Sequence, residues 1–258
     1  MWFIFVLLGV AILFGASDAG FRLGRRIESR TAEPSKSNLA VIQGGLLAVL
    51  SLLLGFTLSM AVNRFEARKQ LVLAEANAIE TAYLRTRLLP APEGAEIANL
   101  LREYVDLRLP QYSDVREDLD RLQATREQAA LLQTEFWTRA VAYEQKGPGS
   151  PSPSAGLLLQ SLNEAIDLES ARWMAIQNHV PSTVIFVNCI VAILATILVG
   201  YGFGREGRRQ AFATSMFVLA ITVVLAVIVD LDRPRQGLIQ VSQQPLVDLQ
   251  QHMLTSKQ

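Results

Sequence analysis

The chain has 258 residues, of which 24 are Lys or Arg, 24 are Asp or Glu and 50% are apolar, and its mean hydropathy is +0.26. So apolar a chain with so few charges is unusual for a water-soluble domain, and the composition indicates a membrane protein. Balanced charge argues against nucleic-acid binding, which needs a basic excess. A single cysteine, Cys189, permits no internal disulfide, and two histidines exclude a His-rich metal site.

Four stretches are apolar enough to cross a bilayer as helices, which takes about 20 residues each. The first runs from residue 1 to about residue 17. It has no basic region ahead of its apolar run, so we interpret it as a retained helix rather than a cleaved secretory signal. The other three are uncharged throughout and comprise residues 39–62, 181–204 and 211–229.

Between the second and third spans lies a polar segment, residues 63–180, whose apolar residues recur at helical spacing. Prolines and a Gly-Pro-Ser-rich linker at 147–154 divide it into predicted helices at 64–89, 93–109, 114–145 and 155–177. No segment alternates as a strand does. The sequence therefore predicts an all-α membrane protein with four transmembrane helices and a helical extramembrane insert. The predicted parts are residues 1–62, 63–180 and 181–232, followed by a polar C-terminal tail at 233–258.

The orientation in the membrane has two readings. Basic residues gather after the first span, from Arg22 to Lys36, and after the third, from Arg205 to Arg209. The positive-inside tendency would make those connections cytoplasmic and place the insert and both termini outside. Other basic residues, such as Arg64 and Arg233, flank the opposite membrane ends, so this majority is modest.

The second span has two different faces on a helical wheel. One is rich in leucine and valine: Leu46, Leu47, Val49, Leu50, Leu53 and Leu54. The other is a stripe of small, polar and a few bulky residues: Gly44, Gly45, Ala48, Ser51, Leu52, Gly55, Phe56, Ser59 and Asn63. We expect the leucine face to meet lipid and the stripe to meet protein or water. Ordinary helix packing and pore lining are both compatible with such a stripe.

Three motifs carry a family resemblance. The second span ends in Gly55-Phe56, followed by Arg64-Phe65 and Arg68; Glu75-Ala-Asn-Ala-Ile comes next; and Asp230-Leu-Asp-Arg-Pro-Arg-Gln-Gly237 precedes Pro245-Leu246. These runs, and the plan of four spans with a helical insert, resemble the bestrophin channels. They are most similar to the bacterial bestrophin-like proteins. The resemblance covers the spans and the tail well and the insert poorly.

The resemblance implies a homopentameric channel, mostly for chloride and other small anions, although some bacterial members prefer cations. It implies a hydrophobic neck on the second helix at Ala48, Leu52 and Phe56, with Ser59 further along the pore-lining stripe. Ala48 departs from the family's bulky pattern, so a ring there would be wider. The resemblance also implies a cytoplasmic insert, contrary to the charge count, and both orientations stay open. Only the start of the calcium clasp of animal members is present, so calcium gating is not expected.

Four further residues are candidates for the pore mouth or for subunit contacts: Asn63, Arg64, Asp230 and Asp232. Arg64 suits anion attraction, but arginines at a membrane boundary also extend to lipid headgroups. The two aspartates follow a helix C-terminus, where acids are disfavoured, so they should have partners. A structural ion pair is the more favoured role for them and an ion-selecting ring the alternative. Asn188, inside the third span, is expected to bond to another helix.

No constellation for catalysis appears, since the sequence has no phosphate-binding loop, nucleophile elbow or His-x-x-x-His pair. We therefore expect no enzyme activity, cofactor or metal. The favoured function is passive conduction of small ions, anions favoured, by a homo-oligomer in the bacterial inner membrane. Its partners are the lipid bilayer and inorganic ions. The alternative is a non-conducting sensor or scaffold whose insert binds a ligand or a partner protein.

Overall fold

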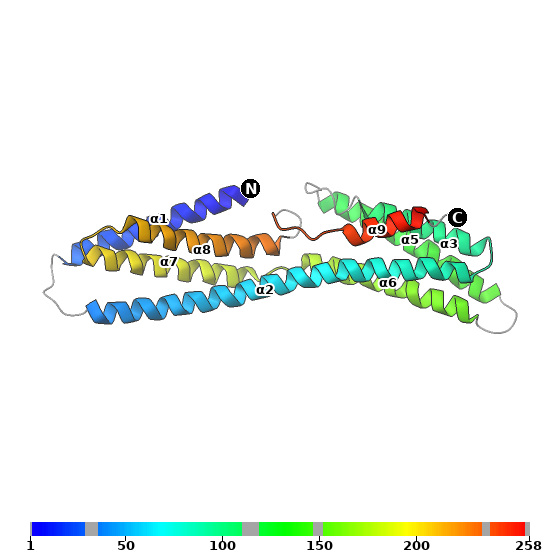
Figure 1. The fold of residues 1–258 in the computed structure, drawn as a ribbon, viewed down its shortest axis with the longest axis horizontal. Helices are drawn as coiled ribbons and strands as arrows, with labels where there is room; N and C mark the ends of the chain where they lie inside the picture. Colours follow the sequence, from blue (N-terminus) through cyan, green and yellow to red (C-terminus); the bar gives the residue numbers. More distant parts are fainter. Residues whose placement is uncertain (1, 29–35, 110–118, 147–151, 234–237, 256–258) are drawn as a thin grey trace. The chain divides into compact units, whose positions relative to one another are not determined.

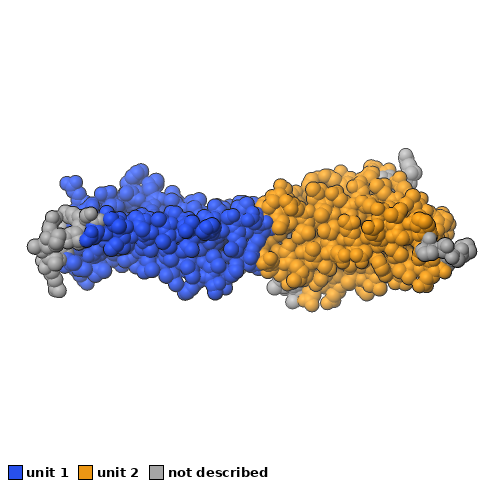
Figure 2. Space-filling view, turned by 90° about the horizontal axis from the view of Figure 1, so that it is seen from below, with its two compact units in different colours: residues 1–64, 179–239 blue, residues 65–178, 240–258 orange. Residues whose placement is uncertain are grey.

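The computed structural model describes residues 2–28, 36–109, 119–146, 152–233 and 238–255. Every regular element in these ranges is a helix (Figure 1), which confirms the predicted all-α class. Four helices are long and apolar enough to cross a membrane. The chain divides into two compact units (Figure 2). Unit 1 comprises residues 1–64 and 179–239, and unit 2 comprises residues 65–178 and 240–258.

Unit 1 contains α1 (Trp2–Glu28), the first part of α2 (Lys36–Arg85), α7 (Ser182–Arg205) and α8 (Ala211–Asp232). The predicted bounds of the last two spans agree with α7 and α8 within a few residues. The first span was predicted too short, because α1 continues to Glu28. The basic residues assigned to a connecting loop therefore lie partly on this helix: Arg22, Arg25 and Arg26.

Helix α1 continues past residue 17 although charged residues follow, because Asp18, the first of them, has cationic partners. The Arg22 Nε lies 2.6 Å from the Asp18 carboxylate one turn earlier, and Arg209 Nη2 donates to the same carboxylate at 2.9 Å. A helix can therefore continue past its apolar segment without leaving an unpaired acid. Hydropathy alone places the boundary about three turns too early.

Helices α1 and α7 approach each other backbone to backbone. A Cβ atom added at Gly20 would lie 2.0 Å from the Ile197 carbonyl oxygen, and one at Gly204 would lie 2.2 Å from the Phe21 carbonyl oxygen. Gly24 and Gly200 are equally close to the opposite helix. These glycines form a Gly-x-x-x-Gly pair on each helix, which is how membrane helices reach close van der Waals contact without a hydrophobic driving force. The sequence analysis did not identify this pairing.

Three threonine hydroxyls within the spans are satisfied by their own helices. Thr57 donates to the Leu53 carbonyl at 2.7 Å, Thr196 to Ala192 at 2.7 Å and Thr222 to Val218 at 2.8 Å. Each bond joins residues four apart, so the donor does not need water in a hydrocarbon environment. The short turn between α7 and α8 uses Gly207 at φ 66°, a conformation that glycine adopts without strain.

Unit 2 contains α2 from Phe65 onward, followed by η1 (Thr86–Leu88), α3 (Glu93–Arg108), α5 (Leu119–Lys146), α6 (Pro153–Gln177) and α9 (Gln244–Thr255). The predicted helices at 64–89, 93–109 and 155–177 match α2 with η1, α3 and α6 within a few residues. Helix α5 matches the described part of the helix predicted at 114–145. The chain turns at Pro90 and Pro92, as expected. Residues 110–118 and 147–151, which include most of the predicted linker, lie outside the described residues.

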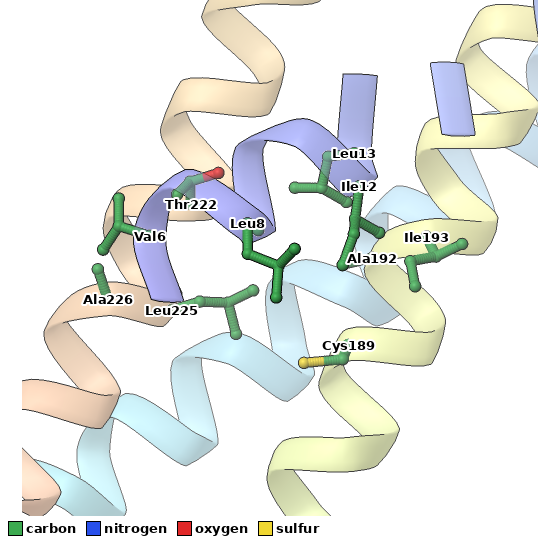
Figure 3. Close-up of a pocket in the computed structure, with 11 residues that line it drawn as sticks. Val6, Leu8, Ile12, Leu13, Cys189, Ala192, Ile193, Thr222, Leu225 and Ala226 are labelled. Carbon is green, nitrogen blue, oxygen red and sulfur yellow. The ribbon is translucent and has the colours of Figure 1, made fainter. Parts of the chain in front are cut away.

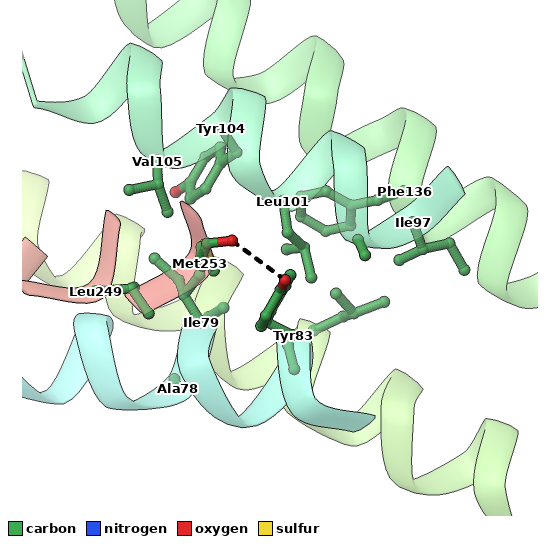
Figure 4. Packing of buried hydrophobic residues seen from close by; sticks show 14 of the residues in the cluster. Ala78, Ile79, Tyr83, Ile97, Leu101, Tyr104, Val105, Phe136, Leu249 and Met253 are labelled. Carbon is green, nitrogen blue, oxygen red and sulfur yellow. Dashed lines mark hydrogen bonds between the residues drawn. The ribbon is translucent and has the colours of Figure 1, made fainter. Parts of the chain in front are cut away.

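One apolar core holds unit 2 together (Figure 4). Its centre is formed by side chains from α2, α3, α5, α6 and α9, all buried, among them Ile79, Leu101, Phe136, Leu158 and Leu246. The Tyr104 and Phe136 rings meet edge to face, with centroids 6.0 Å apart. An edge-to-face pair adds directional attraction to the burial of apolar surface. Leu158 and Leu162 on α6 are buried in this core.

The C-terminal segment differs from the predicted polar tail because it contains α9. Leu246, Leu249 and Met253 recur at three- and four-residue steps and are buried in the core of unit 2. Polar contacts flank them: His252 Nδ1 lies 2.8 Å from the Glu80 carboxylate, and Gln250 donates to Asp106 at 2.7 Å. Only one face of this short helix is apolar, and its many glutamines hide that face in an averaged hydropathy.

Candidate functional site

The stripe on α2 lies on the surface of unit 1. Ala48, Leu52, Phe56 and Ser59 are all exposed, and their spacing of four, four and three residues puts them on one line along the helix. Leu52 is 59% exposed and Phe56 is 65% exposed. The structure thus brings the predicted neck residues together on one outward face. Their lining of a pore stays a prediction.

The opposite face of α2 packs inside the unit, where Leu50 and Leu54 are 3% and 8% exposed. The leucine face was expected to meet lipid, and that expectation is wrong for these two residues. Leucine suits lipid and a protein interior equally well, so composition does not distinguish the two surroundings. Val49, at the edge of the face, is exposed as expected.

Two polar contacts fix α2 against α7 and so set the direction of the stripe. Asn188 Nδ2 donates to the Thr57 hydroxyl at 2.9 Å, and Gln43 Nε2 donates to the Leu198 carbonyl at 2.7 Å. Asn188 is almost completely buried, so the predicted bond to another helix is confirmed. Polar bonds of this kind resist rotation of one membrane helix against another. The exposed stripe is therefore held in a defined orientation.

Asn63 continues the exposed line one turn after Ser59, whereas Arg64 is half-buried. Successive residues on a helix differ in direction by about 100°, so Arg64 leaves the line that Asn63 follows. Asn63 thus remains the better placed of the two for a position at the end of the stripe. A role for either at a pore mouth stays a prediction.

Asp230 and Asp232 have partners within unit 1 that the sequence analysis did not identify. The Asp230 carboxylate accepts hydrogen bonds from the backbone N–H groups of Leu238 and Ile239, both at 2.8 Å. Asp232 accepts from the Val180 N–H at 2.7 Å, and His179 Nδ1 lies 3.2 Å from its carboxylate. Both aspartates are buried, and they hold the chain after α8 and before α7. Backbone donors thus stabilise the acids near the unfavourable end of α8.

A cavity of about 140 Å³ lies between α1, α7 and α8 (Figure 3). Apolar side chains form almost all of its surface, with Leu8, Ile12 and Leu225 around it and Cys189 and Thr222 as the polar-capable members. No charged side chain belongs to the described lining. An ion there would lose its hydration without replacement. The cavity is therefore unsuited to holding an ion.

In unit 2, the run Glu75-Ala-Asn-Ala-Ile that contributes to the family resemblance has a clear structural basis. Glu75 is fully buried, Ala76, Ala78 and Ile79 pack in the core, and Asn77 faces outward. Arg108 donates to Glu75 Oε1 through Nη2 at 2.7 Å and Nε at 3.1 Å. Arg172 Nη1 donates to Glu75 Oε2. One carboxylate therefore joins α2 to α3 and α6.

Glu169 extends this buried ionic cluster. Arg108 Nη1 lies 3.3 Å from Glu169 Oε1, and Arg126 Nε lies 3.6 Å from the same oxygen. Gln243, just before α9, accepts a hydrogen bond from Arg172. Sequence reasoning missed Arg108, Arg172 and Glu169 because nothing in their spacing marks a pairing over such long separations. The motif around Glu75 was the only available signal.

Tyr104 lies at the edge of the cluster. Its hydroxyl is 3.5 Å from Glu75 Oε1 and accepts a hydrogen bond from Gln133 at 3.2 Å. Burial raises the pKa of Tyr104 far above its ordinary value, and the positive charge of Arg108 only partly opposes this. Tyr104 therefore stays a neutral donor to the cluster.

Arg68, also part of the motif at the end of the second span, is a helix-capping residue. It is buried and donates to the Ala175 carbonyl through Nε and to the Asn178 carbonyl through Nη2, each at 3.0 Å. These carbonyls belong to the end of α6, where backbone acceptors lack partners within the helix. At least one residue of the sequence motif, Arg68, therefore stabilises the fold.

These features define an all-helical membrane protein with an outward-facing α2 stripe and a separately packed helical unit. The family model for the Bestrophin-like domain matches residues 11–246, so the chain belongs to the bestrophin-like family. The resemblance seen in the motifs is thereby confirmed. A comparison with curated proteins found no match.

Solved structures support the same fold. A crystal structure of a bacterial bestrophin homologue from Klebsiella pneumoniae carrying a single substitution is 15% identical, with a TM-score of 0.73 over 97% of this chain and 98% of that one. A structure of a bestrophin homologue from the same organism, phased with zinc, is 16% identical, with a TM-score of 0.70 over 98% and 97% of the two chains. At these identities the likeness establishes the fold alone.

Proposed function

We propose that this protein is a homo-oligomeric ion channel whose pore is lined by the α2 stripe. The observation that carries the proposal is the exposure of Leu52 and Phe56 on a face that the described parts of its own chain leave uncovered. Unit 1 of a single chain has too few helices to enclose an ion pathway. Several copies around an axis would bring the same face of each α2 together.

The chemistry of the stripe suits a narrow, gated path. Rings of Leu52 and Phe56 would form an apolar constriction, which can close by losing its water and open by a small increase in radius. Ser51 and Ser59 are exposed beside these rings and offer hydroxyl groups to water or ions. Ala48 would form a wider ring. Passage would be passive, because the stripe contains no titratable group between Gly44 and Asn63.

Family resemblance favours a pentamer, small anions and the bacterial inner membrane, and we include these in the proposal. Ring width and the charges at the two ends of the pore would set selectivity. The rival hypothesis, a non-conducting sensor or scaffold, draws support from the independent core of unit 2. Under that hypothesis the exposed Phe56 on α2 would meet lipid, as the exposed Phe186 on α7 would.

The test uses purified full-length protein in two steps. Light scattering in mild detergent measures the subunit number, and a monomer would refute the proposal, because one chain does not surround a pore. Planar bilayers with a potassium chloride gradient then measure current and reversal potential for the wild type, Leu52→Ala and Phe56→Ala. We expect larger or differently gated currents in both variants.

Phe186→Ala is the matched control, since Phe186 is 66% exposed on α7, the same residue type at nearly the same exposure as Phe56. Its current should equal that of the wild type. The sign of the reversal potential separates anion from cation preference. A folded oligomer that stays silent, or that responds equally to Phe56→Ala and Phe186→Ala, would shift support to the sensor or scaffold.

A further inference from the structure

A hollow of about 400 Å³ lies in unit 2 where α2, η1 and the first half of α3 meet. Its described lining contains two arginines, Arg87 and Arg102, together with Tyr83 and Asn99, and no acidic side chain. The volume falls in the range of pockets that accept small ligands. The lining thus combines excess positive charge with enough room for a molecule.

Arg102 is held rigidly at one side of the hollow. Its Nη1 donates to Asn99 Oδ1 at 2.7 Å, its Nε donates to the Met253 carbonyl at 3.3 Å, and its Nη2 donates to the Tyr83 hydroxyl. A guanidinium has five N–H donors in a fixed plane. These three bonds fix its position and leave further donor capacity. Such preorganisation lowers the entropy cost of binding an anion.

Arg87 brings a second positive charge to the same tyrosine. The Arg87 guanidinium carbon lies 6.0 Å from the centroid of the Tyr83 ring, and that of Arg102 lies 5.0 Å from it. Tyr83 is almost fully buried, so the ring is a fixed support for both. Two cations near one ring repel each other, and a bound anion would relieve that repulsion.

Two neighbouring acids have partners outside the hollow. Glu80 is paired with His252 at 2.8 Å, and Asp106 accepts from Gln250 at 2.7 Å. Asp106 and Glu103 line a separate hollow beyond Arg102, between α3 and α9. The acidic and basic linings therefore lie on different sides of Arg102.

The rest of the lining is apolar and small, with Ala91, Ala95 and Ala98 prominent. Alanine side chains leave space for a short alkyl group, and burying that group against them is favourable because it removes apolar surface from water. We propose that this hollow binds a small organic anion, whose carboxylate or phosphate group lies between Arg87 and Arg102 and whose short apolar body rests on these alanines. Such a site would give the protein an effector separate from the ions it is proposed to conduct.

The test is isothermal titration of full-length protein in detergent with butanoate, propyl phosphate and inorganic phosphate. We expect saturable binding of at least one of the two organic anions, tighter than that of inorganic phosphate. Comparing butanoate with propyl phosphate identifies the preferred head group. Absence of saturable binding for all three anions at millimolar concentrations would overturn the proposal. If inorganic phosphate binds as tightly as the organic anions, the proposed contact between an alkyl group and the alanines is refuted.

Three variants place the site. Arg87→Gln removes one charge from an exposed side chain and should weaken binding about tenfold, as expected for one charge-assisted contact. Arg85→Gln is the matched control, because Arg85 ends α2 two residues before Arg87 but donates to the Leu157 carbonyl outside the hollow. Ala95→Leu fills the space at an exposed helical position and should weaken the organic anions more than phosphate. Equal binding by Arg87→Gln and wild-type protein would refute the assignment.

Discussion

Replacing Glu75 by glutamine should strongly destabilise unit 2. The glutamine keeps the size of the side chain but removes the negative charge that Arg108 and Arg172 share. Both guanidiniums are almost completely buried, so water does not replace the lost carboxylate. Removing one partner of a buried ion pair costs about 3–5 kcal/mol.

That cost corresponds to a fall in melting temperature of roughly 6–20 °C for a domain of this size. Tryptophan fluorescence during thermal unfolding of the full-length protein is a suitable assay, because Trp137 and Trp173 both lie in unit 2. Glu135→Gln is the control. Glu135 pairs with Arg139 at 2.9 Å on the exposed face of α5, where solvent screens the charges, so its melting should match the wild type.

A double variant separates charge from packing. Adding Arg172→Met to Glu75→Gln removes one of the two stranded cations and leaves Arg108 beside Glu169. Part of the lost stability should therefore return. If Glu75→Gln melts within about 2 °C of the wild type, or if the second change lowers stability further by its full separate effect, the proposed role of buried charge is refuted.

Three other predictions concern single contacts. Gly204→Ala should destabilise the α1–α7 contact by about 1–3 kcal/mol in steric-trap unfolding in bicelles, because its Cβ would clash with a carbonyl. Gly15→Ala on α1 meets no atom within 4 Å and should be neutral or stabilising in that assay. Asn188→Ala should cost about 0.6–1.7 kcal/mol in steric-trap unfolding in bicelles, and no loss would show that its bond to Thr57 contributes little. Tyr104→Phe tests the raised pKa of Tyr104, because an unfolded tyrosine ionises near pH 10 whereas folded Tyr104 stays protonated. The wild type should therefore lose stability above about pH 10 relative to the variant. Parallel profiles of stability against pH for the two proteins would contradict this.

Much of the fold follows from local sequence. The spans at α7 and α8 are predicted because uncharged runs of this length have few alternatives. The insert helices are predicted because their apolar residues recur at helical spacing and prolines separate them. The first span was cut short at residue 17 because charged residues follow from Asp18 onward. Its later turns also pack through Gly20 and Gly24, which contribute little hydropathy.

The candidate site was only half predictable. Periodicity correctly groups Leu52 with Phe56 on one face, since that depends on the helix alone. It does not determine which face turns outward, because that depends on contacts such as Asn188 with Thr57 across the fold. The partners of Asp230 and Asp232 are backbone N–H groups, which carry no sequence signal. The two arginines of the hollow in unit 2 are brought together only by the turn after α2.

The position of α9 has a consequence for how the chain is made. Unit 2 is discontinuous, since α2 to α6 are synthesised before the last two apolar helices and α9 after them. Its core needs Leu246, Leu249 and Met253 for completion. The core of unit 2 therefore stays incomplete, with an apolar face uncovered, while α7 and α8 enter the bilayer. Membrane insertion of that hairpin thus precedes closure of the core of unit 2, so any delay in insertion lengthens the time during which the nascent chain needs protection by chaperones.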